Sequence, residues 1–211
     1  MDNILKELIE TSSTIFIKAN ESFLFAKYFD TANNEYEQSV IKKPSVRFIQ
    51  HSLWKNCIIE LDKIFGISGV NNNYSFINIF TYIRKNQSSL FTDISHYTIL
   101  NQKWNELNKS KQPLIVQINK LRKKLYAHTD TGKEKLLSEI DISYIEIEEL
   151  LKDTLSLIKE IYSVLFSTDY HYKPIFFRNV KIVQTIAEQQ QLLREERVNH
   201  ILNKIPDRSR R

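Results

Sequence analysis

The chain has 211 residues, which is enough for one domain with a substantial buried core. Its 30 Lys and Arg residues exceed its 25 Asp and Glu residues by five, an excess that permits a polyanionic partner but does not require one. Three glycines and four prolines are too few for the turns of a hairpin-rich β protein, and we therefore expect an all-α fold.

The first predicted element is a long amphipathic helix. Apolar residues recur at three- and four-residue spacing over residues 4–29, and Asp2 is suited to cap the amino end. This period is lost over residues 31–43, where polar residues predict a linker. Pro44 and Ser45 then mark the start of the next helix.

A second long helix is expected over residues 45–65. Its apolar face includes Cys57, which we interpret as a core thiol. Because it is the one cysteine of the chain, it excludes an internal disulfide and a cysteine-based zinc site. Gly66 is placed to end this helix, and after a loop over residues 69–73, Ser75 is expected to cap a short amphipathic helix.

Further helices are predicted in the second half of the chain. One begins near Asp93, although the polar stretch 108–112 weakens its pattern. Pro113 suits the first turn of the next helix, whose apolar stripe carries the chain to His128. A strong amphipathic segment follows over about 141–166, and together these helices suffice for an up-and-down bundle.

The carboxyl-terminal part differs in character. The aromatic residues of the chain are more simply interpreted as core than as platforms for stacking on bases. Tyr170 and Tyr172 are the candidate exception, because their segment breaks the helical period. A helix over about 179–204 has only a thin apolar stripe and leads into a basic tail. We therefore expect a helical bundle over residues 1–173 and a helical appendage over residues 174–211.

No segment is suited to cross a membrane. Uninterrupted apolar runs stay well short of the roughly 20 residues that span a bilayer. Charged residues already occur in the first turns of the chain, as Asp2 and Lys6 show. We therefore expect a soluble, cytoplasmic protein.

The predicted helix that starts at Pro113 has an arginine and a histidine near its carboxyl end. Arg122 and His128 are separated by five residues, within the sequence Leu-Arg-Lys-Lys-Leu-Tyr-Ala-His-Thr-Asp. One interpretation is structural, because basic side chains near a carboxyl end favourably meet the helix dipole. On a regular helix, six positions turn the chain by about 240°, so the two side chains share no face. A working pair requires either unwinding near Ala127 or two subunits.

The same stretch resembles the Arg-x(4-6)-His motif of the HEPN superfamily, and its fuller pattern looks like the AbiU-type abortive-infection branch. The resemblance implies an all-helical bundle and a homodimer in which both motifs line one cleft. It also implies an endoribonuclease that uses neither a metal nor another cofactor. The implied biological role is that of a toxin or antiphage effector, with an antitoxin or defence-system protein as a candidate partner.

The chemistry of these side chains suits the implied reaction. Imidazole titrates near neutrality, so His128 is expected to be the general base or acid as a 2′-hydroxyl attacks the adjacent phosphorus. The Arg122 guanidinium matches two phosphoryl oxygens, and the implied products carry 2′,3′-cyclic phosphate and 5′-hydroxyl ends. Asp130 is a candidate for orienting the imidazole, with a capping or turn role as the alternative. Tyr126 is a candidate for contacting phosphate or a base, with a packing role as the alternative.

The sequence also permits two functions without catalysis. Active HEPN ribonucleases usually carry Asn, Asp or His after the arginine, whereas this chain has Lys123, which donates to phosphate but cannot accept. A non-catalytic HEPN module that binds RNA or a protein partner is therefore the main alternative, and a helical scaffold is the third. Arg47 and His51 are candidates to line the cleft, with a packed histidine as the alternative for His51. No metal site is predicted, because no histidine has partners at ligand spacing.

Overall fold

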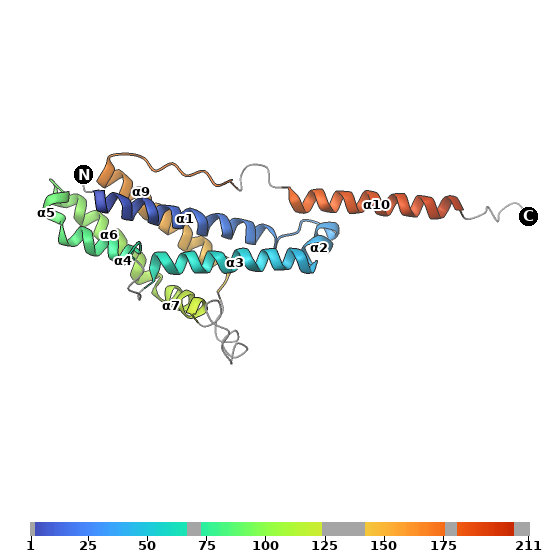
Figure 1. Ribbon diagram of the computed structural model, residues 1–211, viewed down its shortest axis with the longest axis horizontal. Coiled ribbons are helices and arrows are strands. Elements are labelled where there is room, and N and C mark those ends of the chain that lie inside the picture. The colour runs from blue at the N-terminus through green and yellow to red at the C-terminus, as the bar shows by residue number, and fades with distance from the viewer. Residues whose placement is uncertain (1–2, 67–72, 124–141, 176–180, 205–211) are drawn as a thin grey trace, which may run out of the picture.

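The computed structural model describes residues 3–66, 73–123, 142–175 and 181–204, and every regular element in these ranges is a helix (Figure 1). The all-α prediction is confirmed for this part of the chain. The helices are α1 (Asn3–Tyr28), α2 (Glu35–Ile41), α3 (Pro44–Phe65), α4 (Phe76–Lys85), α5 (Gln87–Leu90), α6 (Ile94–Ser110), α7 (Gln112–Leu121), α9 (Tyr144–Phe166) and α10 (Ile182–Lys204).

Helices α1 and α3 form the centre of the bundle and run side by side in opposite directions (Figure 1). Helix α9 packs against α1 and α6, and α7 packs against α3. The apolar faces of α1, α3, α4, α6, α7 and α9 meet in one core, whose fully buried side chains include Phe16, Phe23, Ile58, Leu61 and Ile158. Each such side chain stabilises the fold by about 1.5–3 kcal/mol relative to exposure, which explains why these helices pack together.

Cys57 lies in this core with no exposed surface, so its interpretation as a core thiol is confirmed. Burial raises the pKa of the thiol far above its usual range, because the thiolate would lose its hydration. The sulfur is therefore held in its protonated, unreactive form.

The predicted linker over residues 31–43 is wrong in part, because it contains helix α2. Asn34 caps this helix by accepting a hydrogen bond from the backbone N–H of Glu37 at 2.9 Å. Val40 is fully buried in a second apolar cluster that also contains Val183 of α10. The helix has seven residues, which is too few for a helical period to emerge from the sequence.

Most predicted helix ends are confirmed. Pro44 is the first residue of α3, Ser75 accepts from the backbone N–H of Asn78 at the start of α4, and the Asp93 carboxylate accepts from the N–H of Ser95 at the start of α6. Gly66 ends α3 as expected, but at φ −57° and ψ 128° it turns into extended rather than left-handed backbone. The weak stretch at residues 108–112 is helical except at Lys111.

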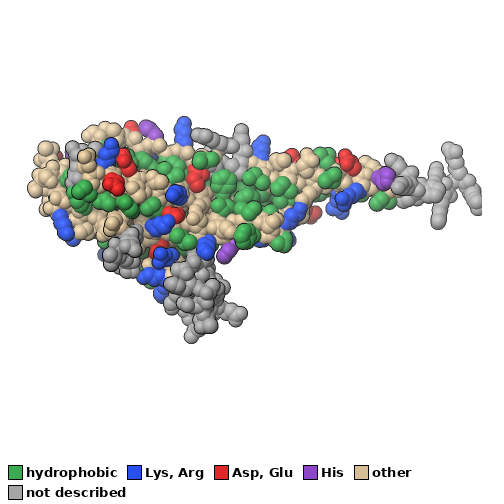
Figure 2. Space-filling model, in the orientation of Figure 1, with side chains coloured by type: hydrophobic (Ala, Val, Ile, Leu, Met, Phe, Trp, Pro, Cys, Tyr) green, Lys and Arg blue, Asp and Glu red, His purple; other side chains and the backbone are tan. Residues whose placement is uncertain are grey.

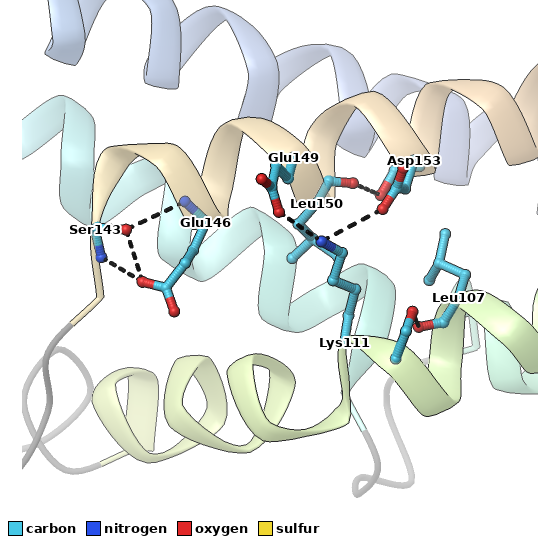
Figure 3. Close-up of polar contacts among 9 residues, drawn as sticks. Leu107, Lys111, Ser143, Glu146, Glu149, Leu150 and Asp153 are labelled. Atoms are coloured by element: carbon cyan, nitrogen blue, oxygen red, sulfur yellow. Dashed lines mark hydrogen bonds and ion pairs between the residues drawn. The ribbon is translucent and has the colours of Figure 1, made fainter.

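Lys111 occupies the junction between α6 and α7 and ties it to α9 (Figure 3). Its Nζ lies 2.9 Å from a carboxylate oxygen of Glu149 and 3.6 Å from one of Asp153. The bond to Glu149 raises the pKa of Lys111, so the ammonium is favoured. The amino end of α7 is thereby fixed on α9.

Helix α9 begins with a capping box (Figure 3). The Ser143 hydroxyl accepts from the backbone N–H of Glu146 at 3.2 Å, and the Glu146 carboxylate accepts from the N–H of Ser143 at 2.9 Å. The backbone N–H and the hydroxyl of Ser143 both donate to the Glu146 carboxylate, and these two bonds lower the pKa of Glu146. The predicted start near Asp141 was therefore slightly early: Asp141 lies outside the described residues, and the helix itself starts at Tyr144.

After α9 the chain returns along α1 (Figure 1). The Tyr172 hydroxyl donates to the Glu21 carboxylate at 2.7 Å and accepts from the Asn20 amide at 3.2 Å. The Tyr170 ring lies 4.7 Å from that of Tyr162, and burial raises the pKa of Tyr170 to about 12. Both rings thus pack on the bundle and are partly buried, and a role in stacking on a base stays a prediction.

Helix α10 extends away from the bundle (Figure 1) and contacts α2 near its own amino end. Val183 and Ala187 are buried there, whereas Leu192, Leu193, Val198 and Ile201 are exposed. The division of the chain at residue 173 stays a prediction. None of the described helices is both long and apolar enough to cross a bilayer.

Candidate functional site

Two residues of the predicted motif, Arg122 and Lys123, are described. Helix α7 ends at Leu121, and the next two residues continue it in a wider, π-helical turn. Such turns are rare and often occur at functional sites. Arg122 itself keeps α-helical dihedral angles (φ −58°, ψ −50°), and its backbone N–H donates to the carbonyl oxygens of Ile118 and Asn119. The expected 240° separation of Arg122 and His128 stays a prediction, because His128 is not among the described residues. The other predicted members of the motif lie outside the described residues: Tyr126, Ala127, His128 and Asp130.

Arg122 is paired with Asp62, an acidic residue near the end of α3. The Arg122 Nε lies 3.5 Å from Oδ2 of Asp62, and Nδ2 of Asn119 donates to Oδ1 of the same carboxylate at 2.8 Å. Asn119 and Arg122 are three positions apart, so the last turn of α7 presents both donors to one acceptor on α3. The carboxyl end of α7 is thereby fixed on α3.

The two members of the ion pair differ in exposure. The Asp62 side chain is 11% exposed, whereas that of Arg122 is 44% exposed. A guanidinium has five N–H donors in a fixed plane, and the contact with Asp62 uses the Nε side. Arg122 is therefore anchored from within the protein while much of its side chain faces solvent, where a phosphate can reach it.

Burial raises the pKa of Asp62, and this effect outweighs those of its neighbours. The hydrogen bond from Asn119 and the charges of Arg122 and Lys123 act in the opposite direction and lower the pKa. A buried carboxylate without such partners would cost several kcal/mol. The ionised form of Asp62 thus depends on the three side chains at the end of α7.

Sequence reasoning missed Asp62. Its neighbours Leu61 and Ile64 are fully buried, and the helix was interpreted as an apolar core element. One signal was available: acidic residues are almost never fully buried unless paired, and α3 has two of them, Glu60 and Asp62, within its apolar last turns.

Arg47 and His51, the candidates for lining the cleft, both lie exposed on α3. At 100° per residue, His51 is about 20° and Arg47 about 60° around the helix from Asp62, so the three share a side. At 1.5 Å per residue, they lie roughly 16 Å and 22 Å along the axis from Asp62. They therefore lie on the same side of α3 as Asp62 but roughly 16 Å or more from it along the helix axis.

The surroundings of His51 and Arg47 differ. The alternative of a packed His51 is wrong, because the residue is exposed. Arg47 donates to the Asp30 carboxylate at 2.8 Å and so forms an ion pair just after the end of α1, and its place in the cleft stays a prediction. On the face shown in Figure 2, Lys and Arg side chains gather over α3 and α7, interspersed with a few acidic ones.

The hollows found in the described part lie elsewhere. One of about 220 Å³ lies between α6 and α9, with Lys103, Leu107 and Asp153 in its lining, and another of about 540 Å³ follows α2 and the residues before it. Neither is lined by Arg122 or Asp62. Among the described residues, no three His, Cys, Asp or Glu side chains are grouped so that they could hold a metal ion.

The chain matches a known family of helical domains. The model of the AbiU2 family of HEPN domains matches residues 2–186, which include the whole helical bundle, the motif at residues 122–130 and the first residues of α10. No curated protein and no solved structure matches the chain significantly. The chain therefore belongs to the AbiU2 family and carries an abortive-infection HEPN domain over nearly its whole length.

Proposed function

We propose that this protein is a metal-independent endoribonuclease that acts in the cytoplasm as a toxin or abortive-infection effector in antiphage defence. The observation that carries the proposal is the state of Arg122: its side chain is 44% exposed and is held from behind by a nearly buried carboxylate. An arginine presented in this way suits a phosphate ligand, and in this proposal it serves as the arginine of the HEPN motif.

The reaction requires a proton to leave the 2′-hydroxyl as its oxygen attacks the adjacent phosphorus. His128 is the general base or acid in this proposal, since its imidazole titrates near neutrality. Arg122 stabilises the negative charge that develops on the phosphoryl oxygens. The bond to the 5′-oxygen breaks, and this oxygen takes up a proton from the general acid or from water. The ends formed are a 2′,3′-cyclic phosphate and a 5′-hydroxyl. Asp130 and Tyr126 are the supporting candidates, for the imidazole and for phosphate or base.

Arg47 and His51 offer a path for the RNA strand. Both are exposed on the side of α3 that also bears Asp62. Basic side chains in such a row bind the RNA backbone by releasing counterions, so binding is expected to weaken as salt is raised. Lys123, exposed next to Arg122, adds a further positive charge.

The active form in this proposal is a homodimer. Two copies of the motif lining one cleft would supply several basic groups to one RNA, and a twofold axis makes such a composite site self-complementary. An antitoxin or another defence protein that covers this cleft is the partner we expect to control the activity.

The second candidate function is an RNA- or protein-binding HEPN module without catalysis. Lys123 favours this second function. An ammonium next to the arginine can donate a hydrogen bond to phosphate, but it cannot accept one. The positive charge of Lys123 also lowers the pKa of Asp62, the partner of Arg122.

End-group analysis after incubation of purified protein with RNA separates the two functions. The expected result is fragments with 2′,3′-cyclic phosphate and 5′-hydroxyl ends, formed equally well with and without EDTA. Fragments that require added divalent metal would reject the mechanism. Intact RNA that nevertheless binds the protein in a salt-dependent manner would establish the binding module instead.

A further inference from the structure

We propose that Asp62 is a positioning residue for the reaction: from α3 it holds Nε of Arg122 so that the opposite edge of the guanidinium faces the scissile phosphate. This inference rests on the proposed ribonuclease function. It adds to the motif a residue 60 positions earlier in the chain, on a different helix.

Asp62 contacts one particular nitrogen of the Arg122 guanidinium. Oδ2 of Asp62 lies 3.5 Å from Nε of Arg122, so the carboxylate approaches the guanidinium from the Nε side. A guanidinium that binds a phosphate with two parallel bonds presents one edge of its plane to two oxygens. A carboxylate on the Nε side leaves the edge formed by the two terminal nitrogens for the phosphate.

The Asp62 carboxylate is itself held in place by its surroundings. Asp62 is almost buried, and its other oxygen accepts from Asn119 at 2.8 Å. By contrast, Asp30, which pairs with Arg47, has a side chain that is 37% exposed. Asp62 is thus held in place before any ligand arrives, whereas a surface carboxylate such as Asp30 has freedom to move.

The consequence for catalysis follows from the flexibility of arginine. A long side chain loses rotamer entropy when it is fixed, and a misplacement of about 1 Å at a reacting centre can cost on the order of 100-fold in rate. A group that fixes Arg122 in advance stabilises the transition state more than the bound RNA. Loss of this group is therefore expected to lower kcat and to change KM little.

The test compares cleavage by wild type, Asp62→Asn and Glu160→Gln. Asp62→Asn keeps the shape of the side chain and its acceptor for Asn119 but removes the charge next to Arg122. Glu160→Gln is the matched control, because Glu160 forms a partly buried interhelical pair with Lys103 at 2.9 Å on the α6–α9 side. We expect Asp62→Asn to lower kcat by about tenfold or more with KM within about threefold, and Glu160→Gln to change neither.

The same substitution, Asp62→Asn, is also made in a second variant, in order to distinguish a positioning role from a general structural role. In an Arg122→Lys protein, which has no Nε–H, we expect Asp62→Asn to lower kcat less than about twofold further. A purely structural Asp62 would lower the rate by the same factor in both backgrounds. By NMR, the proton on Nε of Arg122 should exchange with solvent more slowly in wild type than in Asp62→Asn, whether or not RNA is present.

The outcomes are distinguishable. If wild type cleaves RNA and Asp62→Asn retains its kcat, or exceeds it because Asp62 competes with phosphate, the positioning role is overturned while the ribonuclease proposal stands. Equal losses in both backgrounds, or equal exchange of the Nε proton in wild type and Asp62→Asn, also overturn it. A wild type that leaves RNA intact overturns both proposals.

Discussion

Asn119 donates a hydrogen bond of 2.8 Å to Asp62 and so ties the last turn of α7 to α3. We expect Asn119→Ala to destabilise the protein by about 1–3 kcal/mol, because it leaves a nearly buried carboxylate without its principal donor. The free energy of unfolding from urea titrations measures this change.

The loss of unfolding free energy in Asn119→Ala should depend on pH. Burial raises the pKa of folded Asp62 above its unfolded value, so the folded state favours the protonated carboxyl and loses that stability as pH rises through the folded pKa. The Asn119 bond favours the charged form and offsets part of this loss. Asn119→Ala should therefore cost more at pH 7 than at pH 4. Asn56→Ala, which removes a 2.7 Å bond to the neutral Ser22 hydroxyl, should cost the same at both, and equal behaviour of the two variants would contradict the electrostatic account.

Arg122→Ala and His128→Ala are each expected to abolish RNA cleavage and any cellular toxicity. Because the Arg122 side chain is half exposed, Arg122→Ala should lower the melting temperature by only a few degrees, and the same is expected of His128→Ala. Cleavage assays and thermal melts of the same preparations provide the measurement.

Matched controls exist for both substitutions. Arg84→Ala removes an exposed arginine from the last turn of α4, and His96→Ala removes an exposed histidine from α6. Both should retain wild-type cleavage. A protein that unfolds when Arg122 or His128 is replaced would instead support the scaffold interpretation, in which the basic helix end is structural.

Local signals in the sequence predicted much of the fold. Pro44, Ser75 and Asp93 begin helices in the structure as expected, since capping and first-turn preferences depend on a few adjacent residues. The long apolar periods of α1 and α9 are equally local. Helix α2 was missed because it has seven residues and derives its burial from α10, about 140 positions later in the chain.

The arginine of the candidate site was predicted, but its partner was not. Arg122 belongs to a contiguous motif, whereas Asp62 meets it only because α7 packs on α3. The apolar residues around Asp62 in α3 indicate that its carboxylate needs a partner, but they do not indicate which residue supplies it. Contacts between distant segments depend on the packing angle of the helices, which a single sequence does not specify.

Ser143→Ala is expected to destabilise the protein by about 1 kcal/mol, because it removes one half of the capping box at the start of α9. Since the bonds with Ser143 lower the pKa of Glu146, their small contribution is present above the unfolded pKa and is lost as pH falls. Urea unfolding at neutral pH measures the effect. Ser52→Ala, at an exposed mid-helix position on α3, should change the free energy of unfolding by less than about 0.5 kcal/mol. A similar loss in both variants would contradict the stabilising role of the Ser143 cap.

The Cys57 thiol should be inert in the folded protein. It has no exposed surface, and burial raises its pKa well above the usual range, so little thiolate is present at neutral pH. We expect a thiol reagent such as DTNB to react with Cys57 only after unfolding, at a rate that rises through the urea transition. One thiol per chain should be titrated in full denaturant. Rapid reaction in native buffer would show that the core around α1 and α3 opens far more readily than its packing implies.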